Sequence, residues 1–307
     1  MGATALPSLR MATQLDTGVD AAPELGDGER CQVVRCALPL FLAAVLAAGC
    51  GATHVNVSGA RAPVGEPLPT ARSRMAANGV YPGGVVGASS IAVGRSVQGR
   101  PITVRVLGPD NAPRKILLVG CIHGNECAGI RILSALALIP VPTGVQLWLV
   151  RAMNPDGTAA GTRQNAHGVD LNRNFPYRWQ PVSEATYYSG PHALSEPETR
   201  AAVRLIRGLR PAVTIWYHQQ ENLVDMSGGD RAIARRYAER AGLSATCLPF
   251  LPGTATSWSN HTFPGTTAFV VELPAGPVSA GALRRHLRAL YGVERGERVG
   301  SRTGCGR

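Results

Sequence analysis

Short apolar runs alternate with amphipathic segments over most of this 307-residue chain. Buried strands are indicated at 101–108, 115–120, 145–154, 212–218 and 266–274. Apolar residues recur at helical spacing in 126–138, 195–209, 230–242 and 279–292. Strands that alternate with helices predict an α/β fold, here a three-layer sandwich with a mixed, largely parallel central sheet.

Local signals predict where two of these helices begin or end. Ser195 and Glu198 have the spacing of a capping box, and Pro197 lies in the first turn, where proline is tolerated, so a helix is expected to start there. Gly242 is expected to close the helix that follows Asp230.

Residues 30–50 have the pattern of an export signal. Arginines precede an apolar run of signal-peptide length, and small residues then lead to Cys50. The run is short for a membrane span. Because "LAAGC" approximates a lipobox, we predict a bacterial lipoprotein anchored at Cys50; simple secretion and an uncleaved anchor are the alternatives. Each of these places the protein outside the cytoplasm.

The chain is therefore divided into four parts. Residues 1–50 are the signal peptide and lipobox, 51–75 a flexible linker rich in Gly, Ala, Pro and Ser, 76–295 a catalytic domain, and 296–307 a tail. Four cysteines follow the signal, and one or two disulfides fit an exported protein, although the pairing cannot be read from the sequence: Cys121, Cys127, Cys247 and Cys305.

The formal net charge of +11 is carried almost entirely by arginine. The arginines are scattered and only 5% of residues are aromatic, so the sequence shows no basic and aromatic surface for nucleic acid. We expect no nucleic-acid partner.

Polar residues follow several of the predicted strands. They are His123 with Glu126, Asn154 with Asp156, His218, and Glu272 near the end of its strand. In folds of this class, ligands collect beyond the carboxyl ends of the strands. His123, Glu126 and His218 could supply three ligands with a fourth position open, which is typical of catalytic zinc. On spacing alone, the alternative to a metal site is that His123 is an ordinary buried histidine and Glu126 a helix cap.

A second polar segment, "TRQNAHGVDLNRNFP" at 162–176, contains Arg163, Asp170, Asn172 and Arg173. A guanidinium group can hold a carboxylate at two points or stabilise an oxyanion beside a metal. A solvated, turn-rich surface loop is the alternative.

Several motifs, in order, resemble those of M14-type zinc carboxypeptidases. They are "GRSVQGRPI", "CIHGNE", "NPDG", "GVDLNRNFP", "SEPET", the strand-terminal His218 and "VVELP". The resemblance spans about residues 76–292 and looks more like the bacterial murein-peptide amidase branch than the digestive enzymes. It implies a zinc carboxypeptidase fold with one Zn²⁺ per chain.

The resemblance also implies a role for each residue. His123, Glu126 and His218 would bind zinc, with Asp170 orienting His123. Glu272 would be the general base, and Arg163 would stabilise the oxyanion. Asn172 and Arg173 would hold the free carboxylate of the substrate.

The sequence departs from the family pattern at one position. The resemblance implies a tyrosine about twenty residues before the base. No tyrosine occurs between Ala241 and Glu272. Asn260 and His261 are found there instead, and they are expected either to bind substrate or to complete a loop. Ala255 and Thr256, near the expected specificity pocket, offer no acidic group.

The prediction is therefore a monomeric zinc hydrolase that cleaves a peptide or amide bond near a free carboxylate, in murein stem peptides. A zinc-dependent deacylase of N-acyl amino acids and a non-catalytic murein-peptide-binding module are the alternatives. Contact with a membrane is expected only through the anchor at Cys50.

Overall fold

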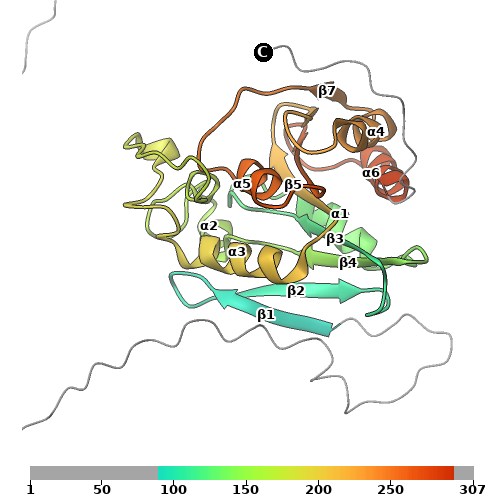
Figure 1. Cartoon of the computed structure of the whole chain (residues 1–307), viewed down its shortest axis with the longest axis horizontal. Helices are drawn as coiled ribbons and strands as arrows, with labels where there is room; N and C mark the ends of the chain where they lie inside the picture. The colour runs from blue at the N-terminus through green and yellow to red at the C-terminus, as the bar shows by residue number, and fades with distance from the viewer. Residues whose placement is uncertain (1–88, 294–307) are drawn as a thin grey trace, which may run out of the picture. The chain divides into compact units, whose positions relative to one another are not determined.

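The computed structural model describes residues 89–293 (Figure 1). The predicted signal peptide with Cys50, the 51–75 linker and the 296–307 tail with Cys305 lie outside the described residues. Within the described range, no helix has both the length and the apolar character needed to cross a membrane.

One sheet of eight strands, ordered β1-β2-β4-β3-β5-β8-β6-β7, forms the centre of the described part. The strands are β1 (Ser89–Arg95), β2 (Pro101–Leu107), β3 (Arg114–Val119), β4 (Val145–Val150), β5 (Val213–Gln219), β6 (Leu223–Asp225), β7 (Ser244–Thr246) and β8 (Thr267–Leu273). Neighbours β4, β3, β5 and β8 run parallel, as do β6 and β7, whereas β1–β2, β2–β4 and β6–β8 are antiparallel. The predicted mixed, largely parallel sheet is confirmed.

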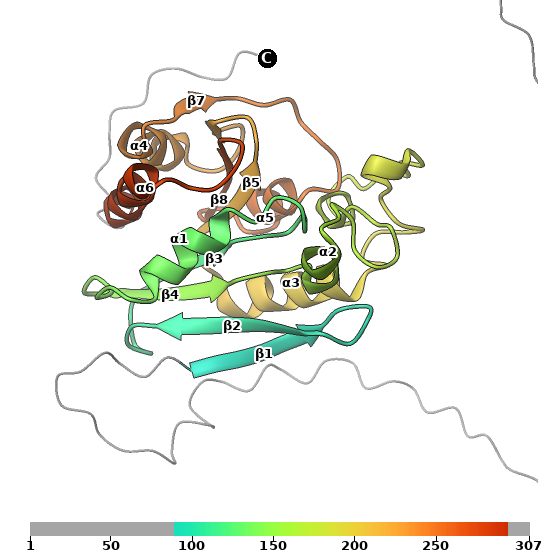
Figure 2. The same ribbon diagram turned by 180° about the vertical axis from the view of Figure 1, so that it is seen from behind.

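Helices cover both faces of the sheet. Figure 1 looks onto the face with α3 (Pro197–Leu209) and α5 (Ala255–Thr262), and Figure 2 onto the face with α1 (Gly129–Leu136). Helices α4 (Arg231–Ala241) and α6 (Ala280–Val293) share the apolar core of α1. Because side chains alternate along a strand, Ile116 of β3 faces this core and Leu117 faces the core under α3. The three-layer sandwich is confirmed.

Short helices lie in the connections. They are α2 (Pro155–Ala160) and two single 3₁₀ turns, Leu171–Arg173 and Ala185–Tyr187. The predicted helix at 126–138 begins only at Gly129, and the predicted strand at 145–154 ends at Val150. The polar ends of both segments therefore belong to loops at the edge of the sheet.

The predicted capping box at the start of α3 is wrong. Glu196 occupies the N-cap position and makes no side-chain cap bond. Ser195 donates its hydroxyl to Glu196 at 2.7 Å, and Glu198 accepts the Val97 N–H at 3.0 Å. Ser195 also accepts a hydrogen bond from Asn174 at 2.9 Å, so both side chains of the expected box bind residues outside the first turn of the helix. The predicted end of α4 is confirmed, since Gly242 adopts φ 72° and its N–H bonds to Ala238 and Glu239 carbonyls.

Candidate active site

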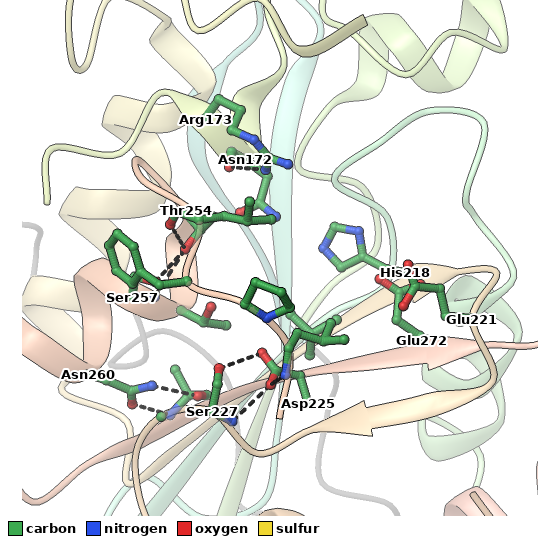
Figure 3. A pocket seen from close by; sticks show the side chains of 18 of the residues that line it. Asn172, Arg173, His218, Glu221, Asp225, Ser227, Thr254, Ser257, Asn260 and Glu272 are labelled. Carbon is green, nitrogen blue, oxygen red and sulfur yellow. Dashed lines mark hydrogen bonds between the residues drawn. The ribbon is translucent and has the colours of Figure 1, made fainter. Parts of the chain in front are cut away.

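The main polar side chains of the site lie at one edge of the sheet, where the parallel strands end. His218 of β5 is in register with Glu272 of β8, near the carboxyl ends of both strands. The loop after β3, which carries His123 and Glu126, leaves from the same edge because β3 is parallel to β5. Figure 3 shows His218 and Glu272 side by side on one wall of the cavity.

Three possible metal ligands converge there. Glu126 Oε2 lies 2.9 Å from Nδ1 of His123 and 2.9 Å from Nδ1 of His218, and the two Nδ1 atoms are 3.1 Å apart. Ligands of a tetrahedral zinc ion stand about 3.3 Å apart, given metal–ligand distances of about 2.0–2.1 Å. The sequence prediction that these three residues meet is correct.

The contacts of the two histidines leave their Nδ1 atoms facing the point where a cation could bind. Asp170 Oδ1 lies 2.9 Å from His123 Nε2, so a ring that used Nδ1 to bind a cation could keep its proton on Nε2 and donate it to Asp170. His218 presents Nδ1 to the same carboxylate. Two imidazole nitrogens and a carboxylate oxygen that converge in this way form a donor set that suits zinc.

Burial and the mutual contacts of these groups shift the pKa values of all three. Burial opposes protonation of His123, but the Asp170 and Glu126 carboxylates outweigh it and raise the pKa of His123. Burial lowers the pKa of His218. Burial would raise the pKa of Glu126, yet hydrogen bonds from the two histidines hold it far below its usual range. Glu126 is thus an anionic ligand.

Asp170 and Arg163 form the layer behind the ligands. Asp170 has no exposed surface, and its Oδ2 accepts from Arg163 Nε at 3.0 Å and Nη2 at 2.9 Å. Arg163 Nη1 also donates to Glu126 Oε1 at 2.6 Å. Burial opposes ionisation of Asp170, but His123 and Arg163 keep its pKa well below the usual value. Asp170 therefore lies where it can orient His123.

Glu272 has the properties of a group that exchanges protons near neutrality. Burial, followed by repulsion from Glu126 and Glu221, raises the pKa of Glu272 to about 7. Its Oε2 atom is buried and has no hydrogen-bond partner within the described residues. A carboxyl group with this pKa and one oxygen without a partner can take up and release a proton at physiological pH.

The "NPDG" segment supports the ligand loop from behind. A Cβ built on Gly124 would stand 1.9 Å from the carbonyl carbon of Gly157, so the two backbones touch. Asn154 accepts the Gly157 N–H at 2.8 Å, and Asp156 binds Arg100 at 2.7 Å. Asn154 and Asp156 follow a strand as the sequence indicates, but they do not line the cavity.

Cys121 and Cys127 are joined in a disulfide with a Cα–Cα distance of 4.7 Å. The bridge encloses the loop that carries His123 and Glu126. Because each sulfur is bonded to the other, neither is available as a metal ligand. The pairing that the sequence left open is therefore Cys121 with Cys127 for this disulfide.

A cavity of about 1120 Å³ opens over the cluster. Its lining includes every predicted site residue except the buried Asp170: His123, Glu126, Arg163, Asn172, Arg173, His218, Asn260, His261 and Glu272. Asn172 accepts the Ala255 N–H at 3.0 Å with its side-chain oxygen, which leaves its amide NH₂ for a ligand. Arg173 and Asn172 lie together on one side of the cavity in Figure 3.

The residues in place of the absent tyrosine have structural contacts. Asn260 donates to the Ala268 carbonyl and accepts the Ala268 N–H, both at 2.8 Å, so it completes a loop. One amide hydrogen remains, and a role in substrate binding stays a prediction. His261 stacks on Tyr177 with ring centroids 3.9 Å apart.

Several cavity residues were not found from the sequence, among them Tyr177, Tyr187, Glu221 and Asp225. Tyr187, 39% exposed, places its ring 5.2 Å from the guanidinium carbon of Arg163 and 5.4 Å from that of Arg173. No local pattern marks these residues, because they come from loops and a short strand that only the fold brings together. Tyr187 lies outside the segment between Ala241 and Glu272, where the family tyrosine is expected.

Comparison with known proteins agrees with this geometry. The zinc carboxypeptidase family, Peptidase_M14, matches residues 141–249. Murein peptide amidase A of Vibrio campbellii is 31% identical over 222 residues, covering 65% of this chain and 85% of the relative. Murein peptide amidase A of Escherichia coli K12 is 34% identical over 138 residues, which cover 41% of this chain and only 57% of the relative.

Solved structures show the same fold. Murein-tripeptide amidase MpaA from Escherichia coli O157 aligns with a TM-score of 0.58 and 24% identity, over 71% of this chain and 96% of that one. Carboxypeptidase A from Helicoverpa armigera aligns with a TM-score of 0.57 and 18% identity, over 68% of each chain. With a relative matched over most of its length and the predicted ligands assembled at one edge of the sheet, this chain belongs to the M14 family of zinc carboxypeptidases.

Proposed function

We propose that this protein is a zinc-dependent hydrolase that cleaves a peptide or amide bond next to a residue with a free carboxylate. The observation that carries the proposal is the arrangement of one cavity. It combines a cluster of three possible ligands, a glutamate with a pKa of about 7, and two arginines. This combination supplies a metal site, a base and an anion site within reach of a single substrate.

His123, Glu126 and His218 would hold the zinc ion, one per chain. When bound, zinc supplies Lewis acidity, which polarises a carbonyl group and makes water a better nucleophile. Asp170 keeps the proton of His123 on Nε2, so Nδ1 stays available as a ligand atom. The disulfide between Cys121 and Cys127 limits the motion of the loop that presents two of the three ligands.

Glu272 would act as the base and then as the acid. It accepts a proton from the attacking water and passes that proton to the leaving nitrogen, a use that its raised pKa suits. Arg163 would stabilise the oxyanion that forms on the scissile carbonyl. Asn172 and Arg173 would hold the substrate carboxylate, for which the guanidinium and the free amide NH₂ are suitable donors.

Murein stem peptides are the proposed substrate class. Support comes from the relatives, which are named murein peptide amidases, and from the export pattern of residues 30–50. Export and a lipid anchor at Cys50 are part of the proposal. Replacing Cys50 by serine should move the protein from the membrane fraction to the soluble fraction of cells that express it, and unchanged membrane association would count against the anchor.

The test of the chemistry uses zinc-loaded protein with three kinds of substrate: defined muropeptides, ordinary L-peptides and N-acyl amino acids. Products are identified by mass. We expect cleavage of the muropeptides, and a loss of kcat of about 100- to 10,000-fold in Glu272→Gln with zinc content unchanged. The exposed Glu239→Gln is the matched control. Full activity in Glu272→Gln would overturn the mechanism, and cleavage confined to L-peptides or to N-acyl amino acids would overturn the substrate class.

A further inference from the structure

Asp225 is a cavity residue on the side away from Arg173 (Figure 3). Asp225 is the last residue of β6, a three-residue strand that pairs with β8. Its neighbour Leu223 is in register with Glu272, so Asp225 lies two residues, about 7 Å, further along the strand from the base. In Figure 3, Asp225 and Ser227 lie below the cavity, and Asn172 and Arg173 lie above it.

The Asp225 carboxylate is held firmly in place. Oδ1 accepts the N–H of Ser227 at 2.8 Å and that of Leu248 at 3.2 Å, and Oδ2 accepts the Ser227 hydroxyl at 2.8 Å. These three hydrogen bonds fix the orientation of the carboxylate. The turn beneath it is braced as well, because a Cβ on Gly228 would stand 2.6 Å from Asn260 Nδ2.

No cation neutralises this carboxylate within the described part of the chain. Its partners there are two backbone amides and one hydroxyl, and none of the ion pairs there involves it. Oδ2 accepts only one hydrogen bond and therefore retains acceptor capacity. An ionised acid that lines an enzyme cavity without a cationic partner is suited to a cation brought by the ligand.

We infer that Asp225 is a specificity-determining residue that binds an ammonium group on the substrate residue carrying the free carboxylate. This inference rests on the proposed function and extends it to the side chain of the substrate. With Arg173 at one end and Asp225 at the other, the cavity accepts such a residue in one orientation, carboxylate toward Arg173 and ammonium toward Asp225. A primary amine on a flexible stem of about four carbons, like that of lysine, has the required chemistry.

A structural role for Asp225, as an anchor of the turn at Ser227, is the competing explanation. The two roles differ in what they predict. A turn anchor affects all substrates alike, whereas an ammonium site affects only substrates that carry the positive charge.

The experiment compares three substrates that differ only in the residue with the free carboxylate: lysine, Nε-acetyl-lysine and norleucine. Each is placed on a γ-linked D-glutamyl scaffold and on an N-acylated L-alanyl scaffold. For zinc-loaded wild-type protein, we expect kcat/KM to be about 10- to 100-fold higher with lysine than with either neutral side chain, the range for a hydrogen bond to a charged group.

Three variants test whether Asp225 causes the preference for lysine. Asp225→Asn should bring the lysine preference to within about threefold of unity while keeping kcat/KM for norleucine within about threefold of wild type. Ser227→Ala keeps the charge and should keep the preference. Asp110→Asn, on an exposed loop outside the cavity, is the matched control and should behave as wild type.

The possible outcomes distinguish a failure of the role given to Asp225 from a failure of the proposed function. Equal cleavage of all three side chains by the wild type, or a lysine preference that survives Asp225→Asn, would overturn the role of Asp225 and leave the proposed function standing. An equal loss on all substrates in Asp225→Asn would identify a turn anchor and also overturn the inference. No cleavage of any substrate on either scaffold would overturn the proposed function, and the inference with it.

Discussion

The Nε2 atom of His123 lies 2.9 Å from a carboxylate oxygen of Asp170, which no solvent reaches. With zinc bound at Nδ1, this contact would hold the remaining ring proton on Nε2 and fix the orientation of the ring. Partners of this kind, behind the metal ligands, typically contribute 10- to 100-fold to metal affinity.

Asp170→Asn should therefore weaken zinc binding by about 10- to 100-fold, because the amide removes the charge that orients and polarises His123. Competition with a chelating dye measures the affinity. Asp156→Asn is the matched control, since Asp156 is equally buried but binds Ser96 and Arg100 and no metal ligand. Equal zinc affinity in wild type and Asp170→Asn would contradict the role given to Asp170.

Gly124→Ala should destabilise the protein by about 1–3 kcal/mol, the range for overpacking a site that cannot relax freely. The added Cβ would stand 1.9 Å from the Gly157 backbone, which no side-chain rotation can relieve. Urea denaturation measures the free energy of unfolding. Gly281→Ala in α6, where the nearest atom is 3.7 Å away, should be neutral or stabilising. A Gly124→Ala protein as stable as wild type would show that the two loops can separate.

Glu272 should make the metal-free protein less stable as the pH rises. Its pKa is about 7 in the folded state against an ordinary 4.5. Below pH 4.5 the group is protonated in both states; between 4.5 and 7 only the unfolded chain releases the proton, so stability is lost as the pH rises. Glu272→Gln should remove this loss, about 1–2 kcal/mol after allowance for partial solvent exposure.

Denaturation in the presence of a chelator at pH 4 and pH 8 tests this expectation. The difference in unfolding free energy between Glu272→Gln and wild type should grow toward pH 8. Glu239→Gln, an exposed carboxyl on α4, serves as the control. A difference that is the same at both pH values would show that Glu272 titrates normally.

His286 should make the protein sensitive to acid. Burial, followed by the charge of Arg285, lowers its pKa to about 4, and its Nδ1 atom lies 2.9 Å from the Tyr237 hydroxyl. Above pH 6.5 the ring is neutral in both states; as the pH falls from 6.5 to 4 only the unfolded chain takes up the proton, so stability is lost. The loss should be about 3 kcal/mol.

His286→Asn should be less stable than wild type at pH 7, because it leaves space in the core, but it should lose less stability between pH 7 and pH 4. Urea denaturation at the two pH values measures both effects. His192→Asn, on an exposed loop, should show the same dependence of unfolding free energy on pH as wild type. If His286→Asn lost as much unfolding free energy between pH 7 and pH 4 as wild type, His286 would not be the source of the acid sensitivity.

Much of the fold could be predicted because the apolar periods are strong. All five predicted strands and the helices at α1, α3, α4 and α6 exist, with ends displaced by a few residues. The capping box at Ser195 failed because residues far away in the chain compete for the same side chains. Strands β1, β6 and β7 and helices α2 and α5 were missed. Strands β6 and β7 have only three residues each and α2 has six, and such brief segments carry little periodic signal.

The sequence alone determined which residues could form a metal site, because strand-terminal His123, Glu126, His218 and Glu272 must meet at one edge of a parallel sheet. It also determined that Arg163 and Arg173 belong to one loop. Only the tertiary structure decided that Asp156 supports the site from outside, that Cys121 pairs with Cys127, and that Tyr187 and Asp225 line the cavity. The reason is physical: order along a strand follows from the local chain, whereas contacts between loops depend on how every layer packs.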